Sequence, residues 1–207
     1  YRYIDFLLHL FSDSKAQTYP FPGEIADCFI KLGTLFSETD PESVASNPFE
    51  RKIFTGKAGL IFERERNALY RAGYSGPEKL FASKTIIEML NAIKKHIAHC
   101  IKINKRSDGM YHAYNVLQIY DDRMEIEMLD EMLEGQVAVL SSGFLSPEES
   151  LALIRALKAS RLYEARQHSY ILYPNKELPP FMQKNCIVQE DILPISEFIA
   201  LTGSKIL

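Results

Sequence analysis

The stretch that decides the fold is residues 83–105, SKTIIEMLNAIKKHIAHCIKINK. Apolar side chains recur there at steps of three and four, the spacing that places residues on one face of an α-helix. They are Ile86, Leu90, Ile93, Ile97 and Ile101. Ser83 precedes them as a candidate N-cap, and Lys102 and Lys105 suit the negative end of the helix dipole. The stretch therefore predicts one long amphipathic helix from Ser83 to about Lys105.

A polar and aromatic turn follows this helix at residues 108–115, DGMYHAYN. Beyond it, the runs Val116–Tyr120 and Arg123–Met128 flank two aspartates, and the second run alternates apolar and charged side chains. Such alternation around a short polar connection is typical of a β-hairpin. We therefore expect a small β-hairpin insertion near residues 113–128.

Helical spacing recurs over most of the remaining chain. The segments predicted to be helical are 1–13, 23–38, a short helix opened by Asp40-Pro41-Glu42, 60–72, 129–140, a helix opened by Ser146-Pro147-Glu148-Glu149, and a weaker one at 192–201. Pro20 and Pro22 are expected to break the chain. Phe49–Gly59, which contains two glycines, is expected to be irregular. Ser146 and Glu149 have the spacing of a capping box, the clearest helix start in the chain.

The predicted helices outnumber the strands and are joined mostly by short loops, so they should pack as neighbours. We expect a mainly α fold, a helical array with the hairpin as its β insertion. We assign residues 1–180 to a helical domain and residues 181–207 to a C-terminal extension with a weak helix.

Composition excludes several classes of protein. The chain is 46% hydrophobic and 25% charged with a net charge of −3, and dedicated nucleic-acid binders usually carry a basic excess, so we expect no nucleic-acid partner. No run of about 18 apolar residues is present, so we expect no membrane span. The cysteines form no CxxC pair, which favours reduced thiols and a cytoplasmic protein. They are Cys28, Cys100 and Cys186.

The polar turn is the first candidate site, because an acid, a histidine, two tyrosines and an asparagine fall within it. Asp108 or His112 could exchange a proton with a substrate. Tyr111 and Tyr114 could stack on a sugar ring, and Asn115 offers both a hydrogen-bond donor and an acceptor. The structural alternative is that the turn only ends the preceding helix while the tyrosines pack.

The second candidate is the acidic run around the start of the helix after the hairpin. Its members are Glu125, Glu127, Asp130, Glu131 and Glu134. Glycoside hydrolysis needs two carboxyl groups about 5–10 Å apart. Glu134 differs from the others because it precedes an apolar segment and adjoins Gln136, a candidate substrate-binding residue. A solvated face is the alternative reading of the run.

Ser142 is the third candidate, because small residues at a helix end could let an anion approach. The alternative is that Gly143 simply ends the helix. No nucleotide-binding glycine loop is present. His96 and His99 lie near Cys100 on the long helix, but no carboxylate follows at a useful spacing. We therefore expect no metal and no cofactor.

Four runs carry a resemblance to a known family. They are AGYSG at 72–76, INKRSDGMYHAYN at 103–115, MLEGQVAVLSSG at 132–143 and YPNKELP at 173–179. These runs lie within residues 72–180, about half of the chain, and resemble a segment of very large bacterial proteins described as cellobiose-phosphorylase-like. Such proteins are similar to the (α/α)6 helical-toroid glycosidases and phosphorylases.

The resemblance implies part of a carbohydrate-active protein, a glycoside phosphorylase or hydrolase, that acts on or binds oligosaccharide. Phosphorolysis needs a general-acid carboxyl and uses phosphate in place of the attacking water. The candidates are Asp108 and Glu134 for catalysis and Tyr111, His112, Tyr114, Asn115, Gln136 and Ser142 for substrate binding. A complete toroid has about twelve helices, more than this chain supplies. We therefore expect the rest of a larger polypeptide, or a homo-oligomer, as a partner.

A shared site requires the two candidate stretches to meet. We expect the turn after the longest helix to fold against the segment that follows the hairpin, forming one polar hollow. The alternative is a helical scaffold or interaction domain without catalysis, which the absence of a strong catalytic signature favours.

Overall fold

The computed structural model describes residues 1–74, 76, 78–184 and 186. Within these residues the chain forms eight helices and three two-stranded antiparallel sheets, which confirms the mainly α fold. The chain divides into two units, Tyr1–Pro174 and Asn175–Leu207. All the helices and strands except α8 belong to the first unit.

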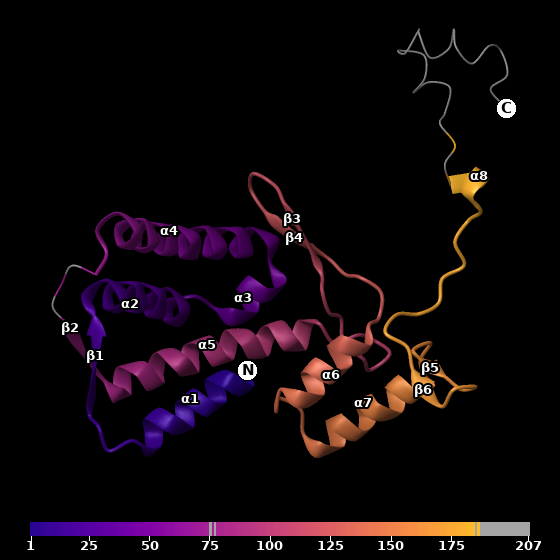
Figure 1. The fold of residues 1–207 in the computed structure, drawn as a ribbon, viewed down its shortest axis with the longest axis horizontal. Helices are drawn as coiled ribbons and strands as arrows, with labels where there is room; N and C mark the ends of the chain where they lie inside the picture. Colours follow the sequence, from indigo (N-terminus) through magenta and orange to yellow (C-terminus); the bar gives the residue numbers. More distant parts are fainter. Residues whose placement is uncertain (75, 77, 185, 187–207) are drawn as a thin grey trace, which may run out of the picture. The chain divides into compact units, whose positions relative to one another are not determined.

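Helix α5 (Ser83–Ile103) is the element against which the N-terminal half packs. It contacts α1 (Arg2–Asp13), α2 (Gly23–Glu38) and α3 (Pro41–Ser46). Figure 1 shows α5 running between α1 on one side and α2 and α3 on the other. The long amphipathic helix is therefore confirmed, and its apolar residues are buried or partly buried because other helices cover more than one of its sides.

The predicted N-cap of this helix is wrong by one residue. Ala82 occupies the N-cap position without a side-chain hydrogen bond, and Ser83 is the first helical residue. The Ser83 hydroxyl instead donates to the carbonyl of Ala16 at 2.6 Å, and its backbone N–H donates to the carbonyl of Gln17 at 2.9 Å. Ser83 therefore joins the start of α5 to the segment after α1.

A two-stranded ribbon precedes two of the helices. Strand β1 (Thr18–Pro22) pairs antiparallel with β2 (Glu78–Ala82), with Tyr19 opposite Phe81. The prediction that Pro20 and Pro22 only break the chain is therefore wrong. Proline is tolerated here because each strand has a free edge, where a missing N–H costs no ladder hydrogen bond. Strand β1 runs directly into α2, and β2 runs directly into α5.

Helix α4 (Pro48–Ala72) corrects the prediction that Phe49–Gly59 is irregular. The Asn47 side chain accepts a hydrogen bond from the backbone N–H of Phe49 at 2.9 Å. With Pro48 as the first helical residue, Asn47-Pro48 both ends α3 and opens α4. The helix then continues through Gly56 and Gly59, and packs on α2, α3 and β4.

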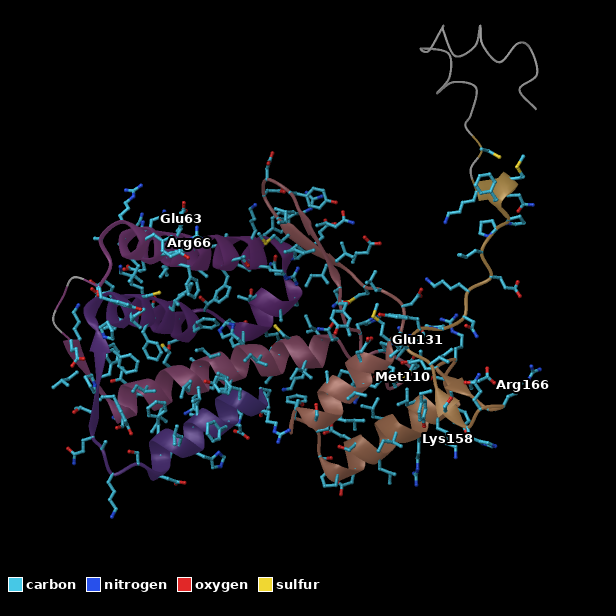
Figure 2. The ribbon with its side chains drawn as sticks, viewed as in Figure 1. Glu63, Arg66, Met110, Glu131, Lys158 and Arg166 are labelled. Atoms are coloured by element: carbon cyan, nitrogen blue, oxygen red, sulfur yellow. The ribbon has the colours of Figure 1, made fainter. Side chains whose placement is uncertain are left out.

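Glu63 and Arg66 lie on the exposed face of α4 and project outward from it in Figure 2. Helix α4 contributes no fully buried side chain. It is therefore an outer helix of the array.

The predicted β-hairpin is confirmed as β3 (Val116–Ile119) paired with β4 (Met124–Glu127). The next helix, α6 (Leu133–Ser141), begins four positions later than the predicted start at residue 129. The backbone explains the delay, because the carbonyl at position 129 accepts a side-chain hydrogen bond from the turn. The first N–H of α6 donates to the carbonyl of Leu172 at 3.0 Å.

Helix α7 (Pro147–Ala159) begins as predicted. The Ser146 hydroxyl accepts from the N–H of Glu149 at 3.1 Å, and the Glu149 carboxylate accepts from the N–H of Ser146 at 2.9 Å, which completes the capping box. A short hairpin of β5 (Tyr163–Glu164) and β6 (Ser169–Tyr170) follows.

Two apolar clusters form the core of the first unit. One joins α1, α2, α5 and the ribbon, and its buried members are Ala26, Phe81, Ile86 and Leu90. The other joins the polar turn to α6 and α7, and its buried members are Met110, Tyr111, Val139, Leu153, Leu157 and Leu162. Met110 and Tyr111 thus anchor the turn in a core, while its two ends stay nearer the surface.

In the second unit, the described residues contain the short helix α8 (Phe181–Lys184). The helix predicted at residues 192–201 lies outside the described residues. Among the helices of the described segments, none combines the length and the apolar character needed to cross a bilayer.

Replacing Gly56 in α4 by alanine should stabilise the protein. A Cβ atom there would meet no heavy atom within 4 Å, and alanine loses less backbone entropy in a helix than glycine. We expect Gly56→Ala to raise the free energy of unfolding by about 0.5–1 kcal/mol, measured by urea denaturation. Gly73→Ala is the control and should destabilise, because Gly73 has φ +67°. No gain from Gly56→Ala would contradict a continuous α4.

Candidate functional site

The polar turn and α6 meet through the side chain of Gln136, which is fully buried. Its Oε1 accepts from the backbone N–H of Tyr111 at 2.9 Å, and its Nε2 donates to the carbonyl of Tyr111 at 2.8 Å. Nε2 also donates to the carbonyl of Met132 at 2.9 Å. The amide therefore pairs with both backbone groups of Tyr111, as a neighbouring strand would. The expected contact between the two stretches is confirmed, but the single polar hollow expected with it is not formed, because the cavity beside them is mainly apolar and neither Asp108 nor Glu134 lines it.

Gly135 allows the same contact to be close. A Cβ atom on Gly135 would lie 2.7 Å from the Cβ of Ala113 and 3.4 Å from the carbonyl oxygen of Tyr111. Neither neighbour is the end of a flexible side chain, so a larger residue would separate α6 from the turn. Gly135 and Gln136 act together as the junction between these elements.

Asp108 stabilises the turn from within. Its carboxylate accepts hydrogen bonds from Arg106 Nε and Nη2 at 2.8–3.1 Å and from the backbone N–H of Met110 at 3.1 Å. The hydrogen bonds from Arg106 lower the pKa of Asp108, against an opposing effect of burial. A general acid needs its proton near neutral pH, and this environment favours the ionised form instead.

Glu131 is a buried carboxylate that the sequence analysis named only as one member of the acidic run. It is 4% exposed, although the acidic run around it suggested a solvated face. Arg161 donates two hydrogen bonds to its carboxylate at 2.8 and 3.0 Å, and Arg106 lies 3.5 Å away. The neighbouring apolar residues at 128, 129, 132 and 133 were the available signal. Figure 2 labels Glu131 beside the start of α6.

Glu134 lies in the first turn of α6. Its Oε2 atom is buried and has no hydrogen-bond partner among the described residues. A buried carboxylate oxygen without a donor is costly, so this atom is a candidate for meeting a group that the chain does not itself provide.

Tyr114 and Asn115 take different positions at the end of the turn. Tyr114 is 67% exposed and has φ 53°, a left-handed conformation that turns the chain toward β3. Asn115 Nδ2 donates to Oδ1 of Asn104 at 2.6 Å, which ties the turn to the end of α5. Tyr114 is free to contact a ligand on the surface, whereas Asn115 has a structural partner.

A cavity of about 550 Å³ opens between α5, α6 and the turn, with further walls from α2, α3 and α4. Its surface is mainly apolar. The apolar residues that shape it include Tyr1, Phe36, Phe54, Ile97, Ala138 and Val139, and its polar residues are His96, Cys100, Asn104, Tyr111, His112 and Ser142. Of the eight predicted site residues, Tyr111, His112 and Ser142 line this cavity, and Asp108, Tyr114, Asn115, Glu134 and Gln136 do not.

His96 is 6% exposed and lies between two aromatic rings. Its ring stacks on Phe54 at a centroid distance of 5.3 Å and meets the edge of Phe36 at 5.0 Å. Its Nε2 lies 3.0 Å from the carbonyl oxygen of Phe36. No sequence pattern connects His96 with these aromatic residues, because they come from α2 and α4.

His112 lies in the turn that connects α5 to the β3–β4 hairpin. Its Nδ1 lies 3.1 Å from the carbonyl oxygen of Leu129, and its backbone N–H donates to the carbonyl of Asn104 at 2.8 Å. Both contacts fix the ring on the wall of the cavity.

Two other polar residues of the wall have little catalytic capacity. The Ser142 hydroxyl donates to the carbonyl of Val139 at 2.7 Å and accepts from the N–H of Phe144 at 3.1 Å. Desolvation raises the pKa of the Cys100 thiol, and nearby Arg51 opposes this only in part. Because the thiolate is the nucleophile, a raised pKa disfavours a nucleophilic role for Cys100.

No group of three His, Cys, Asp or Glu side chains in the described part of the chain is arranged to hold a metal ion. Neither a known protein family nor a characterised protein matches this sequence. The site is therefore defined by its own geometry: an apolar cavity with two histidines on its wall, and two carboxyl groups outside it.

Removing the amide of Gln136 should destabilise the protein strongly. We expect Gln136→Leu to lower the free energy of unfolding by about 2–4 kcal/mol, because the N–H and carbonyl of Tyr111 would remain buried without partners. Urea denaturation measures the change. Gln183→Leu makes the same chemical change at an exposed position and should alter stability by less than about 0.5 kcal/mol. Equal effects at the two positions would contradict the proposed role of the hydrogen bonds between Gln136 and Tyr111.

Acid should weaken the contact at Glu131. Hydrogen bonds from Arg161 lower the pKa of Glu131 below its ordinary value of 4.5, against the effect of burial. The pair therefore stabilises the fold above about that pH and loses its contribution as the pH falls through the lowered pKa. We expect Glu131→Gln to lower the free energy of unfolding at neutral pH. We also expect the variant to lose less of this free energy on acidification than the original protein does. Urea denaturation across a pH series measures both effects. Glu177→Gln, at an exposed residue, should leave the pH series unchanged.

Proposed function

We propose that residues 1–174 form a binding domain for a small ring-bearing molecule, which is held in the cavity between α5 and α6. The observation that supports this proposal most directly is the cavity itself. Its volume of about 550 Å³ is within the range of small-molecule sites, and it combines apolar walls with a few fixed polar groups.

The chemistry of the wall favours binding over catalysis by this chain alone. Neither Asp108 nor Glu134 lines the cavity, and the carboxylate of Asp108 is already bound by Arg106. Desolvation raises the pKa of the Cys100 thiol, which disfavours its thiolate, and the Ser142 hydroxyl is occupied by the helix end. This supports the non-catalytic alternative that the sequence left open.

The aromatic residues indicate the shape of the ligand. Phe36, Phe54 and Tyr1 line the cavity, and flat molecules pack well against aromatic side chains. A planar ring, or the apolar face of a sugar ring, would fill the space between α5 and α6.

A second candidate function is that of a glycoside phosphorylase or hydrolase acting on oligosaccharide, with phosphate as the co-substrate of a phosphorylase and water as that of a hydrolase. The favouring observation is the buried, unpartnered Oε2 of Glu134, since a general acid in such enzymes is a carboxyl in a desolvated setting. The helices would then be part of an (α/α)6 toroid completed by a larger polypeptide or by further copies. The free thiols of all three cysteines support a reducing, cytoplasmic location.

Calorimetric titration of the 207-residue chain with indole and with cellobiose tests both candidates. For a molecule of this size in a well-formed cavity, we expect a Kd on the order of 0.1 mM. Ala138→Trp should weaken binding at least tenfold, because the new side chain would project from the cavity wall and occupy part of the ligand's space. Ala152→Trp places the same residue on the exposed face of α7 and should leave binding unchanged.

The two outcomes separate the proposals. Absence of binding by both probes, or binding that survives Ala138→Trp, would reject the cavity as the site. Formation of glucose 1-phosphate from cellobiose and phosphate, abolished by Glu134→Gln, would establish the second candidate in place of the first.

A further inference from the structure

We infer that the cavity selects a neutral ligand that donates hydrogen bonds from an O–H or N–H group on its ring. This rests on the proposed binding function and adds the chemical class of the ligand. It follows from the tautomers of His96 and His112, which their protein partners determine.

His96 presents an acceptor to the cavity. A carbonyl oxygen can only accept a hydrogen bond, so the 3.0 Å contact with Phe36 requires the proton of the neutral ring to be on Nε2. Nδ1 is then a bare acceptor, and it has no hydrogen-bond partner among the described residues. Because His96 lines the cavity, this nitrogen can accept a hydrogen bond from a ligand or from water.

His112 presents a second acceptor by the opposite tautomer. Its Nδ1 must carry the proton, because the carbonyl of Leu129 lies 3.1 Å away and can only accept. Nε2 is therefore the free acceptor of the neutral ring. Two histidines from different elements thus offer the same kind of group to one cavity.

The other polar groups of the wall are mostly occupied. Asn104 donates from Nδ2 to the carbonyl of Cys100 and accepts at Oδ1 from Asn115. The Ser142 hydroxyl donates to Val139. Tyr111 also lines the cavity, and its hydroxyl can both donate and accept a hydrogen bond. The two histidine nitrogens and this hydroxyl are therefore the acceptors left for a ligand.

The wall also selects against ions. Among the described residues that line the cavity, none is an Asp, Glu, Lys or Arg side chain. A buried charge without a partner costs more than a buried hydrogen-bond donor that finds an acceptor. A neutral donor such as a phenol, an indole or a sugar hydroxyl fits this wall, and a free carboxylate or phosphate does not.

A pair of isomeric probes tests the inference. 3-Methylindole and 1-methylindole have the same size and apolar surface, but only the first has an N–H group. Titrations at about pH 8, where ordinary imidazole is neutral, should show that 3-methylindole binds at least about tenfold more tightly. This is the discrimination expected when a buried acceptor is left unpaired.

Two substitutions identify the acceptors while keeping the structural hydrogen bonds. His112→Asn retains an amide donor at the position of Nδ1, facing Leu129, and removes Nε2. His96→Gln retains a donor at the position of Nε2, facing Phe36, and removes Nδ1. At least one of them should reduce the preference for 3-methylindole to about twofold or less, with 1-methylindole affinity little changed.

The possible results separate failure of the inferred ligand class from failure of the proposed binding function. If neither isomer binds, the cavity is not a ligand site and both proposals fall. If both isomers bind equally, the binding function stands and the inferred donor class is overturned. A preference that survives both substitutions would also overturn it, because the acceptor would then lie elsewhere.

Discussion

The pairing of one buried amide with one backbone residue holds the second half of this molecule together. Gln136 satisfies both the N–H and the carbonyl of Tyr111, which no neighbouring strand or helix reaches. A buried peptide group left without partners is costly, so α6 and the turn are stable only as a pair. Gly135 permits the approach that this pairing requires. The wall of the cavity that contains His112 depends on the same contact.

Glu131 shows a different solution to the burial of polar groups. Its carboxylate is removed from water but keeps two arginine partners, Arg106 and Arg161, one before α6 in the chain and one after α7. A buried charge with its partners in place organises the structure more than it stabilises it. Arg106 also binds Asp108, so the turn and the start of α6 share one guanidinium. Asp108 and Glu131 therefore stabilise the conformation of this turn through Arg106.

Local signals were predictable from the sequence, and distant partners were not. The capping box of Ser146 and Glu149 needs only four residues, and the hairpin needs only its own alternation, so both were predicted correctly. Helix α4 was misread because Gly56 was taken as a helix breaker, although Asn47 opens a helix that is long enough to absorb it. In the site, the pattern identified the turn. It could not show that His96 would meet Phe36, 60 residues earlier in the chain, which decides the tautomer.

The ribbon of β1 and β2 couples two helices that are far apart in sequence. Each strand passes into its helix without an intervening loop, so the last strand residue fixes the rotational phase of the helix that follows. A slip of one residue in the pairing of Tyr19 with Phe81 would turn every strand side chain to the opposite face. It would also rotate α2 or α5 by about 100° relative to its neighbours. The alignment of five residue pairs thus sets the orientation of helices that reach the cavity far from the ribbon.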